Sequence, residues 1–275
     1  MTGTDVFARP PTTVDPRAHL RVTPVRVLRS EWTKFRSLRS TVYTVLAALT
    51  LMIGMGALFA AITADQPGGL KPGESAVSTS LTGTFFAQLA IGVLGVLLIT
   101  GEYSTGMIRS SMTVVPRRLP MLWGTIAVFT AVVFLTMLIA SVTAFLVGQA
   151  ILGGKGLNVS LSDPGALRSV VGAALYVTVA GITALAMGAL LRNTAAAITT
   201  FVAVFFVIPP LTLLLPTSWT AHFVQYLPSS IGTVLTGGTT VAANSLAPWT
   251  GFAVLCGYAV VLTGFAAWRL RRADA

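Results

Sequence analysis

The chain has 275 residues, of which 54% are hydrophobic and only 9% charged, and its mean hydropathy is +0.82. A soluble domain carries roughly 25% charged residues, so this composition leaves too little charge to cover a water-facing surface. It excludes a soluble globular protein and predicts an all-α polytopic membrane protein. The net charge of +10 would suit a nucleic-acid binder, but the positions of the charges matter more than their sum.

The N-terminal segment, residues 1–22, is polar and interrupted by prolines, as in "ARPPTTVDP". It has neither the apolar core nor the small-residue cleavage site of a signal peptide. We expect a disordered tail on the cytoplasmic side.

Residues 23–40 predict an amphipathic helix that lies along the membrane surface. Apolar side chains recur there at steps of three and four, and cationic side chains fall mainly on the other face. Such a helix places aromatic rings at headgroup level and cations on anionic lipid. The residues expected to make these contacts are Arg29, Trp32, Lys34, Phe35, Arg36 and Arg39. The alternative is an ordinary basic flank; nucleic acid is disfavoured, because Thr41 already begins a membrane span.

Six stretches have the roughly 20 apolar residues that cross a bilayer. They are residues 41–64, 81–100, 119–152, 170–191, 195–215 and 249–268. The third is too long for one simple crossing, so we expect it to tilt or to project from the membrane. No span contains Asp, Glu, Lys, Arg or His, which argues against an ion-coupled transporter or a proton relay.

The basic residues predict the orientation of the chain. With a cytoplasmic N-terminus, fifteen Lys and Arg residues fall inside and three outside, at Lys71, Lys155 and Arg168. Loops rich in Lys and Arg stay in the cytoplasm. We therefore expect a multi-pass protein of the bacterial cell membrane with both termini in the cytoplasm.

The loop between the second and third spans predicts a short helix outside the bilayer. Met107, Ile108, Met112 and Val115 recur at nearly helical steps, and Pro116 ends the segment. So short a helix is marginal by itself, so either the membrane surface or a soluble partner must hold it. The spacing leaves both open.

Two stretches carry a resemblance to a known family. "SEWTKFRSLRST" before the first span and "GEYSTGMIRSSMTVVPRR" after the second resemble the membrane subunits of ABC-2 type exporters, particularly the actinobacterial permeases. In that family, E-x-x-x-G followed by proline and basic residues marks the loop after span two, and Glu102, Gly106, Pro116, Arg117 and Arg118 match it. Those permeases often carry a basic residue early in span three; residues 119–124 have none, so no role is carried over there.

The resemblance implies a complex of two permeases, as a homodimer or with a close paralogue, and two cytosolic ATPase subunits that hold ATP and Mg. The loop helix would dock on the ATPase. The expected coupling residues are Glu102, Gly106, Met107, Ile108, Met112, Pro116 and Arg117. The chain itself has no G-x-x-x-x-G-K-[ST] motif, and "GGKG" at 153–156 lacks its spacing.

Residues 216–247 carry no charge although they lie between two spans. The resemblance implies an external re-entrant hairpin here; the alternative is a neutral loop packed on the protein's own outer face. It also implies a substrate path lined by spans two and five. The candidates are Phe85, Phe86, Gln88, Thr199, Phe201 and Phe205. A mid-span amide requires a hydrogen-bond partner, so Gln88 is expected either to bond a neighbouring helix or to line the path.

Groupings typical of catalytic or metal sites do not occur in the sequence: there is no H-E-x-x-H and no Cys/His cluster. We therefore expect no enzymatic activity and no cofactor in this chain. The sequence predicts the permease subunit of an ATP-driven exporter that moves a hydrophobic or amphipathic substrate by alternating access. The alternatives are an uncoupled channel or carrier, and a non-transporting anchor or sensor subunit.

Overall fold

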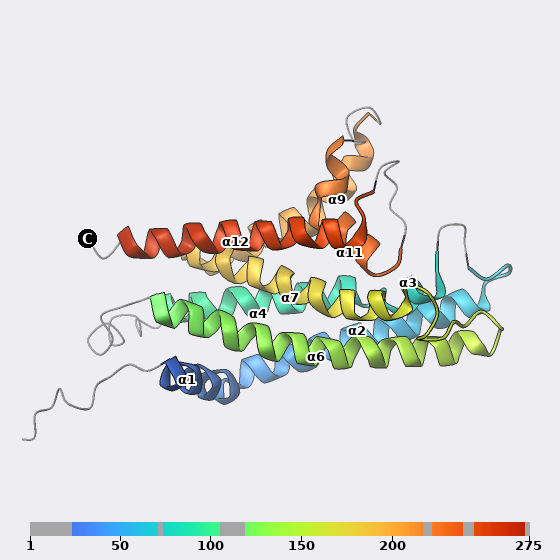
Figure 1. Ribbon diagram of the computed structural model, residues 1–275, viewed down its shortest axis with the longest axis horizontal. Helices are drawn as coiled ribbons and strands as arrows, with labels where there is room; N and C mark the ends of the chain where they lie inside the picture. The colour runs from blue at the N-terminus through green and yellow to red at the C-terminus, as the bar shows by residue number, and fades with distance from the viewer. Residues whose placement is uncertain (1–23, 71–73, 105–118, 217–221, 239–244, 273–275) are drawn as a thin grey trace, which may run out of the picture.

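The computed structural model describes residues 24–70, 74–104, 119–216, 222–238 and 245–272 (Figure 1). These residues form helices and connecting turns, with no strand among them. The helices are α1 (Pro24–Ser37), α2 (Arg39–Asp65), α3 (Ala76–Ser80), α4 (Thr84–Ser104), α6 (Leu119–Gly153), α7 (Ala166–Leu191), α8 (Thr194–Val202), α9 (Ile208–Leu211), α11 (Pro228–Leu235) and α12 (Pro248–Arg272).

Six helical runs are long and apolar enough to cross a membrane: α2, α4, α6, α7, the run from Thr194 to Leu211, and α12. The prediction of an all-helical chain with six such segments is therefore confirmed. In Figure 1 the long helices run side by side, with α1 near one end of the bundle and α3 near the other. We call these the α1 end and the α3 end.

The α6 helix is longer than a bilayer is thick. Its 35 residues form one unbroken helix, which at 1.5 Å per residue is about 52 Å long. The hydrocarbon core is only about 30 Å thick. The third predicted span is thus a single helix that is several turns longer than the hydrocarbon core is thick.

The centre of the bundle is α7, the most deeply buried of the six. It contacts α4, α6, α8, α11 and α12, and small residues let it do so. A Cβ added at Gly95 of α4 would lie 2.5 Å from the Gly181 carbonyl oxygen, and one at Gly188 would lie 2.6 Å from Ile99 Cγ2. These small residues therefore let α4 and α7 pack closely.

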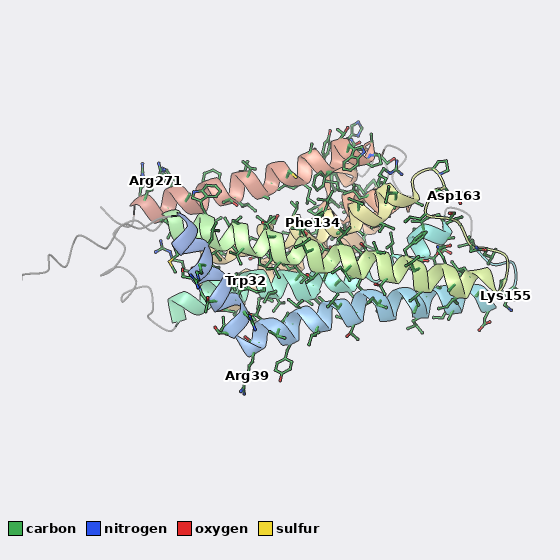
Figure 2. The ribbon with its side chains drawn as sticks, turned by 60° about the horizontal axis from the view of Figure 1, so that its bottom comes forward. Trp32, Arg39, Phe134, Lys155, Asp163 and Arg271 are labelled. Carbon is green, nitrogen blue, oxygen red and sulfur yellow. The ribbon has the colours of Figure 1, made fainter. Side chains whose placement is uncertain are left out.

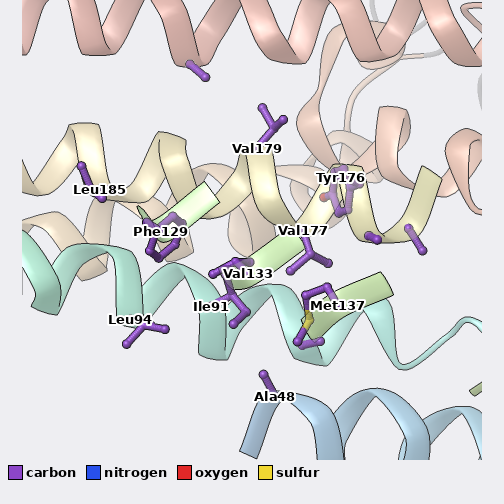
Figure 3. Close-up of a cluster of buried hydrophobic side chains, with 14 of the residues drawn as sticks. Ala48, Ile91, Leu94, Phe129, Val133, Met137, Tyr176, Val177, Val179 and Leu185 are labelled. Atoms are coloured by element: carbon purple, nitrogen blue, oxygen red, sulfur yellow. The ribbon is translucent and has the colours of Figure 1, made fainter. Parts of the chain in front are cut away.

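Larger apolar side chains fill the space around this contact (Figure 3). Phe129, Val133 and Met137 of α6 are fully buried and meet Ile91 of α4 and Val177 of α7 in one cluster. Their spacing of four along α6 places them on one face of the helix. The core therefore joins three long helices along one continuous stripe.

The chain turns sharply at two places at the α1 end. Leu38 has an extended backbone, with φ −80° and ψ 106°, and separates α1 from α2. Arg192 has φ +53° and ends α7, and the Asn193 side chain then accepts a hydrogen bond of 2.9 Å from the Ala196 N–H to cap α8. Residues 192–194 therefore form a tight turn between α7 and α8.

The fifth crossing is irregular at the double proline that the sequence shows. Residues Ala203–Val207 form a π-helical turn, in which the Ile208 N–H bonds to the Ala203 carbonyl five residues back. Pro209 and Pro210 lack N–H groups, and each ring crowds the carbonyl four residues before it. A wider turn at this point relieves that crowding.

The short helix α3 lies close against α2 and α6, where three glycines make room for it. A Cβ at Gly56 would lie 2.3 Å from the Ser80 carbonyl oxygen, one at Gly148 would lie 2.2 Å from Ser80 Oγ, and one at Gly83 would lie 2.0 Å from the Met52 carbonyl oxygen. The sequence analysis did not predict α3 as a separate helix.

We expect Gly56→Ala to lower the free energy of unfolding by about 1–3 kcal/mol, because its methyl group forces α3 away from α2. Gly54→Ala is the matched control: it lies two residues earlier in α2, and an added Cβ there meets nothing within 4 Å. Thermal unfolding of the two purified variants in one detergent checks this. Equal midpoints for the two variants would contradict the close seating of α3.

Candidate functional site

The loop predicted to couple to an ATPase falls mostly outside the described residues. Gly106, Met107, Ile108, Met112, Pro116 and Arg117 lie there. Glu102 belongs to the last turn of α4. In Figure 1, α4 ends and α6 begins at the α1 end of the bundle.

The predicted interface helix, α1, runs across the ends of the long helices rather than along them (Figure 2). Phe35 is buried, whereas Trp32 is 50% exposed although it belongs to the same predicted apolar stripe. The cationic residues Arg29, Arg36 and Arg39 are exposed. One part of the apolar stripe thus packs on the bundle, and another part stays open.

A buried carboxylate joins α1 to α6. Glu31 is only 7% exposed, and its Oε2 lies 2.9 Å from the Thr125 hydroxyl. That hydroxyl also lies 3.0 Å from the Met121 carbonyl oxygen, but it has one proton, and a charged acceptor forms the stronger bond. The interaction links residues 94 positions apart in the chain.

Lys34 completes this contact from α1 itself. Its ammonium lies 3.7 Å from Glu31 Oε2. Burial lowers the pKa of Lys34 below its ordinary value, and the neighbouring Glu31 carboxylate partly opposes that shift. The environment of Lys34 therefore differs from that of the exposed arginines with which the sequence analysis grouped it.

Sequence reasoning missed Glu31. Glu31 is the only acid in a basic helix, and it precedes Lys34 by three residues. This spacing is typical of an ordinary i,i+3 ion pair on a helix surface. The one signal that could have singled out Glu31 is that no second acid accompanies it among the cations of this helix. Nothing local indicates a partner on the third span.

A polar cavity of about 490 Å³ lies toward the α3 end. Residues of α2, α3, α4, α7 and α11 line it. Its polar lining includes Thr63, Ser78, Thr84, Gln88, Tyr176 and Thr233. Glu74 is the only charged residue among the described residues that line it.

Two of the six predicted path residues, Phe85 and Gln88, line this cavity. Phe85 is 47% exposed and its ring meets that of Phe206 edge-on, with centroids 4.8 Å apart. Phe86 is half-buried and Thr199 is exposed.

The other two, Phe201 and Phe205, are fully buried and stack on each other with centroids 4.5 Å apart. The Phe201 ring occupies the space beside Gly92, where an added Cβ would lie 2.1 Å from Cε1. Within one chain the Phe201 ring packs α8 against α4, and Phe205 of the following π-helical turn packs on Phe201.

Within the described residues, Gln88 has no hydrogen-bond partner on a neighbouring helix. It is 1% exposed, and its Oε1 is unpaired within the described part of the chain. The expected bond to another helix is therefore not formed there. The amide instead lies at the wall of the cavity.

Comparison with known proteins identifies no relative: no protein-family model and no curated protein matches the sequence. Among the residues that the structure describes, no three His, Cys, Asp or Glu side chains are grouped so that they could hold a metal ion.

We expect Thr125→Val to loosen α1, because a buried carboxylate that loses a hydrogen bond costs about 1–3 kcal/mol. Limited trypsin digestion in detergent should cleave at Arg29–Arg36 roughly tenfold faster than in wild type. Thr130→Val is the control in the same helix, since the Thr130 hydroxyl bonds only to the Ile126 carbonyl of its own helix, at 2.7 Å. Equal cleavage of the two variants would show that this contact does not hold α1.

Proposed function

We propose that the chain is the permease subunit of an ATP-driven ABC-2 type exporter that moves a hydrophobic or amphipathic substrate by alternating access. The observation that carries the proposal is α1: an amphipathic helix, fixed across the end of the bundle by the buried Glu31–Thr125 contact. A helix in that position, with exposed cations and an exposed Trp32, suits the membrane surface. The resemblance of "SEWTKFRSLRST" points to the same family.

The charges support a cytoplasmic α1 end. Figure 2 places Arg39 and Arg271 toward this end and Lys155 and Asp163 at the opposite one. The described basic residues at the α1 end are Arg26, Arg29, Lys34, Arg36, Arg39, Arg192, Arg269, Arg271 and Arg272. The described acids of the α3 end, Asp65, Glu74 and Asp163, balance its few cations. By the positive-inside rule, the α3 end faces the outside of a bacterial cell membrane.

The proposed coupling follows from the connections of the loop at residues 105–118. The loop joins α4, which packs along α7, to α6, which holds α1 through Thr125. A partner ATPase that moves this loop would therefore shift α4 and α6 together. ATP binding and hydrolysis on the partner would supply the driving free energy, and α1 would follow α6 at the lipid interface.

The segment between the fifth and sixth crossings supports an external gate. Within it, α11 packs against α7 and α12, with Ile231 and Leu235 buried. A Cβ at Gly232 would lie 2.5 Å from the Tyr176 ring, so α11 sits close on α7. We propose that α11 is part of the re-entrant hairpin, and that the substrate path runs between two copies of the chain.

Co-purification from detergent tests this proposal. The tagged chain is expressed with its neighbouring genes as wild type, Glu102→Ala and Gly106→Pro. We expect an ATPase to co-elute with wild type, and each loop variant to lose it or to lose at least tenfold of the ATPase stimulation. Asp65→Ala, an acid at the α3 end, is the control and should behave as wild type.

Two outcomes would overturn parts of the proposal. If no ATPase associates and the loop variants behave as wild type, a self-sufficient channel or carrier is the better assignment. If an ATPase associates but extracts of hydrophobic compounds never stimulate it, the chain is an anchor or sensor subunit.

A further inference from the structure

The cavity at the α3 end holds polar groups whose hydrogen bonds the protein itself does not complete. Gln88 and Thr84 are 1% and 4% exposed, and neither Gln88 Oε1 nor Thr84 Oγ1 has a partner among the described residues. Both line the cavity from α4. An unpaired amide is costly, above all in a membrane-spanning helix, so these groups indicate a site for a hydrogen-bonding ligand.

Four other threonine hydroxyls in the lining indicate which hydrogen-bonding groups the ligand must have. Thr79 and Thr82 donate to the carbonyls of Ser75 and Ser78, at 3.0 and 3.1 Å. Thr233 and Thr236 likewise donate to carbonyls of their own segment, at 3.0 and 3.1 Å. Their protons are used, and their oxygens remain as acceptors. These four threonines therefore favour a ligand that donates hydrogen bonds, whereas the Tyr176 and Ser229 hydroxyls, which also line the cavity, can donate to a ligand.

The charge of the lining further restricts the chemical class of the ligand. Glu74 is its only charged residue, and no Lys, Arg or His lines the cavity in the described part of the chain. Phosphate and carboxylate groups would meet no cation and one carboxylate. Anionic lipid headgroups are therefore disfavoured.

The Gln88 amide in the cavity wall favours a hydroxylated ligand over an ammonium ion. An ammonium group donates only, so it would leave the Gln88 amide hydrogens without an acceptor. A sugar or polyol hydroxyl both donates and accepts, and can pair with both ends of the amide and with Thr84. The rings of Phe59, Phe85 and Tyr176 offer apolar surface for the ligand's C–H groups.

We propose that this cavity binds the uncharged, hydroxyl-bearing headgroup of an amphiphile, a glycosyl or polyol group. A volume of about 490 Å³ is within the range of small-molecule sites. Gln88 and Thr84 recognise the headgroup, and the half-exposed Phe85 on the flank of α4 leaves an apolar side for the chain attached to it. The site is formed by one chain alone and does not depend on the ATP-driven transport proposed above.

Photolabelling of the wild-type protein in phosphatidylcholine nanodiscs tests the proposal without any ATPase. Three probes carry the same diazirine-bearing acyl chains: a monoglucosyl diacylglycerol, a phosphatidylglycerol, and a diacyl lipid with a primary ammonium headgroup. We expect the glucosyl probe to label residues 74–88 about tenfold more than the other two. Gln88→Leu should reduce that labelling about tenfold and Thr84→Val severalfold.

Thr130→Val, the same change on α6 away from the cavity, is the control and should label as wild type. The unfolding midpoint separates recognition from a structural role: Gln88→Leu removes an unpaired buried amide, so the ligand-free variant should unfold at the same or a higher temperature. Equal labelling by all three probes, preference for the primary ammonium lipid, or unchanged labelling of both variants would overturn the proposal. A chain that fails to bind an ATPase but still selects the glucosyl probe would contradict only the exporter assignment.

Discussion

The structure depends on how closely helix backbones can approach one another. Helices in a lipid bilayer gain little by leaving the hydrocarbon, so their association relies on close packing and on a few hydrogen bonds. In this chain α7 supplies the packing surface, and Gly95 and Gly181 bring α4 against it. The same helix supports α11, because an added Cβ at Gly172 would lie 3.0 Å from the Leu235 carbonyl oxygen. The polar cavity exists because α4, α7 and α11 are held at these distances.

Two buried glutamines show how paired and unpaired polar groups differ in this bundle. Gln149 of α6 donates to the Ala76 carbonyl and the Ser80 hydroxyl, each at 3.0 Å, and accepts from the Val159 N–H at 2.8 Å. Its amide is bonded at both ends and ties α3 to α6. Gln88 is also buried, at 1% exposed against 8% for Gln149, and its Oε1 has no partner among the described residues. Composition and hydropathy treat the two alike; only the surroundings distinguish them.

The sequence was sufficient for features that depend on local composition. The six apolar segments follow from the missing charge, and the turn at Arg192–Thr194 follows from its polar residues. The amphipathic pattern of α1 is also local, although which of its apolar residues would be buried is not. Phe35 packs on the bundle and Trp32 does not, because α6 covers only part of the stripe.

Contacts between distant residues could not be predicted in this way. The Glu31–Thr125 bond joins two residues that each look ordinary in their own helix, since threonines in membrane helices usually bond to their own backbone. The cavity draws residues from five helices, and α3 is too short to show a periodicity. The π-turn at Ala203–Val207 lies just before the proline pair, as their steric effect requires, but proline pairs also simply end helices.

The threonines of the cavity wall have a consequence for how such a protein can diverge. Thr79, Thr82 and Thr233 each bond their proton to their own backbone, so they add polarity to the cavity and almost nothing to the contacts between helices. Exchanging Thr79, Thr82 or Thr233 for valine or serine would leave the bundle nearly as stable as before. Mutation can therefore alter the inner surface of this chamber while the scaffold around it stays constant, and related chains with the same helices are free to differ in what they hold.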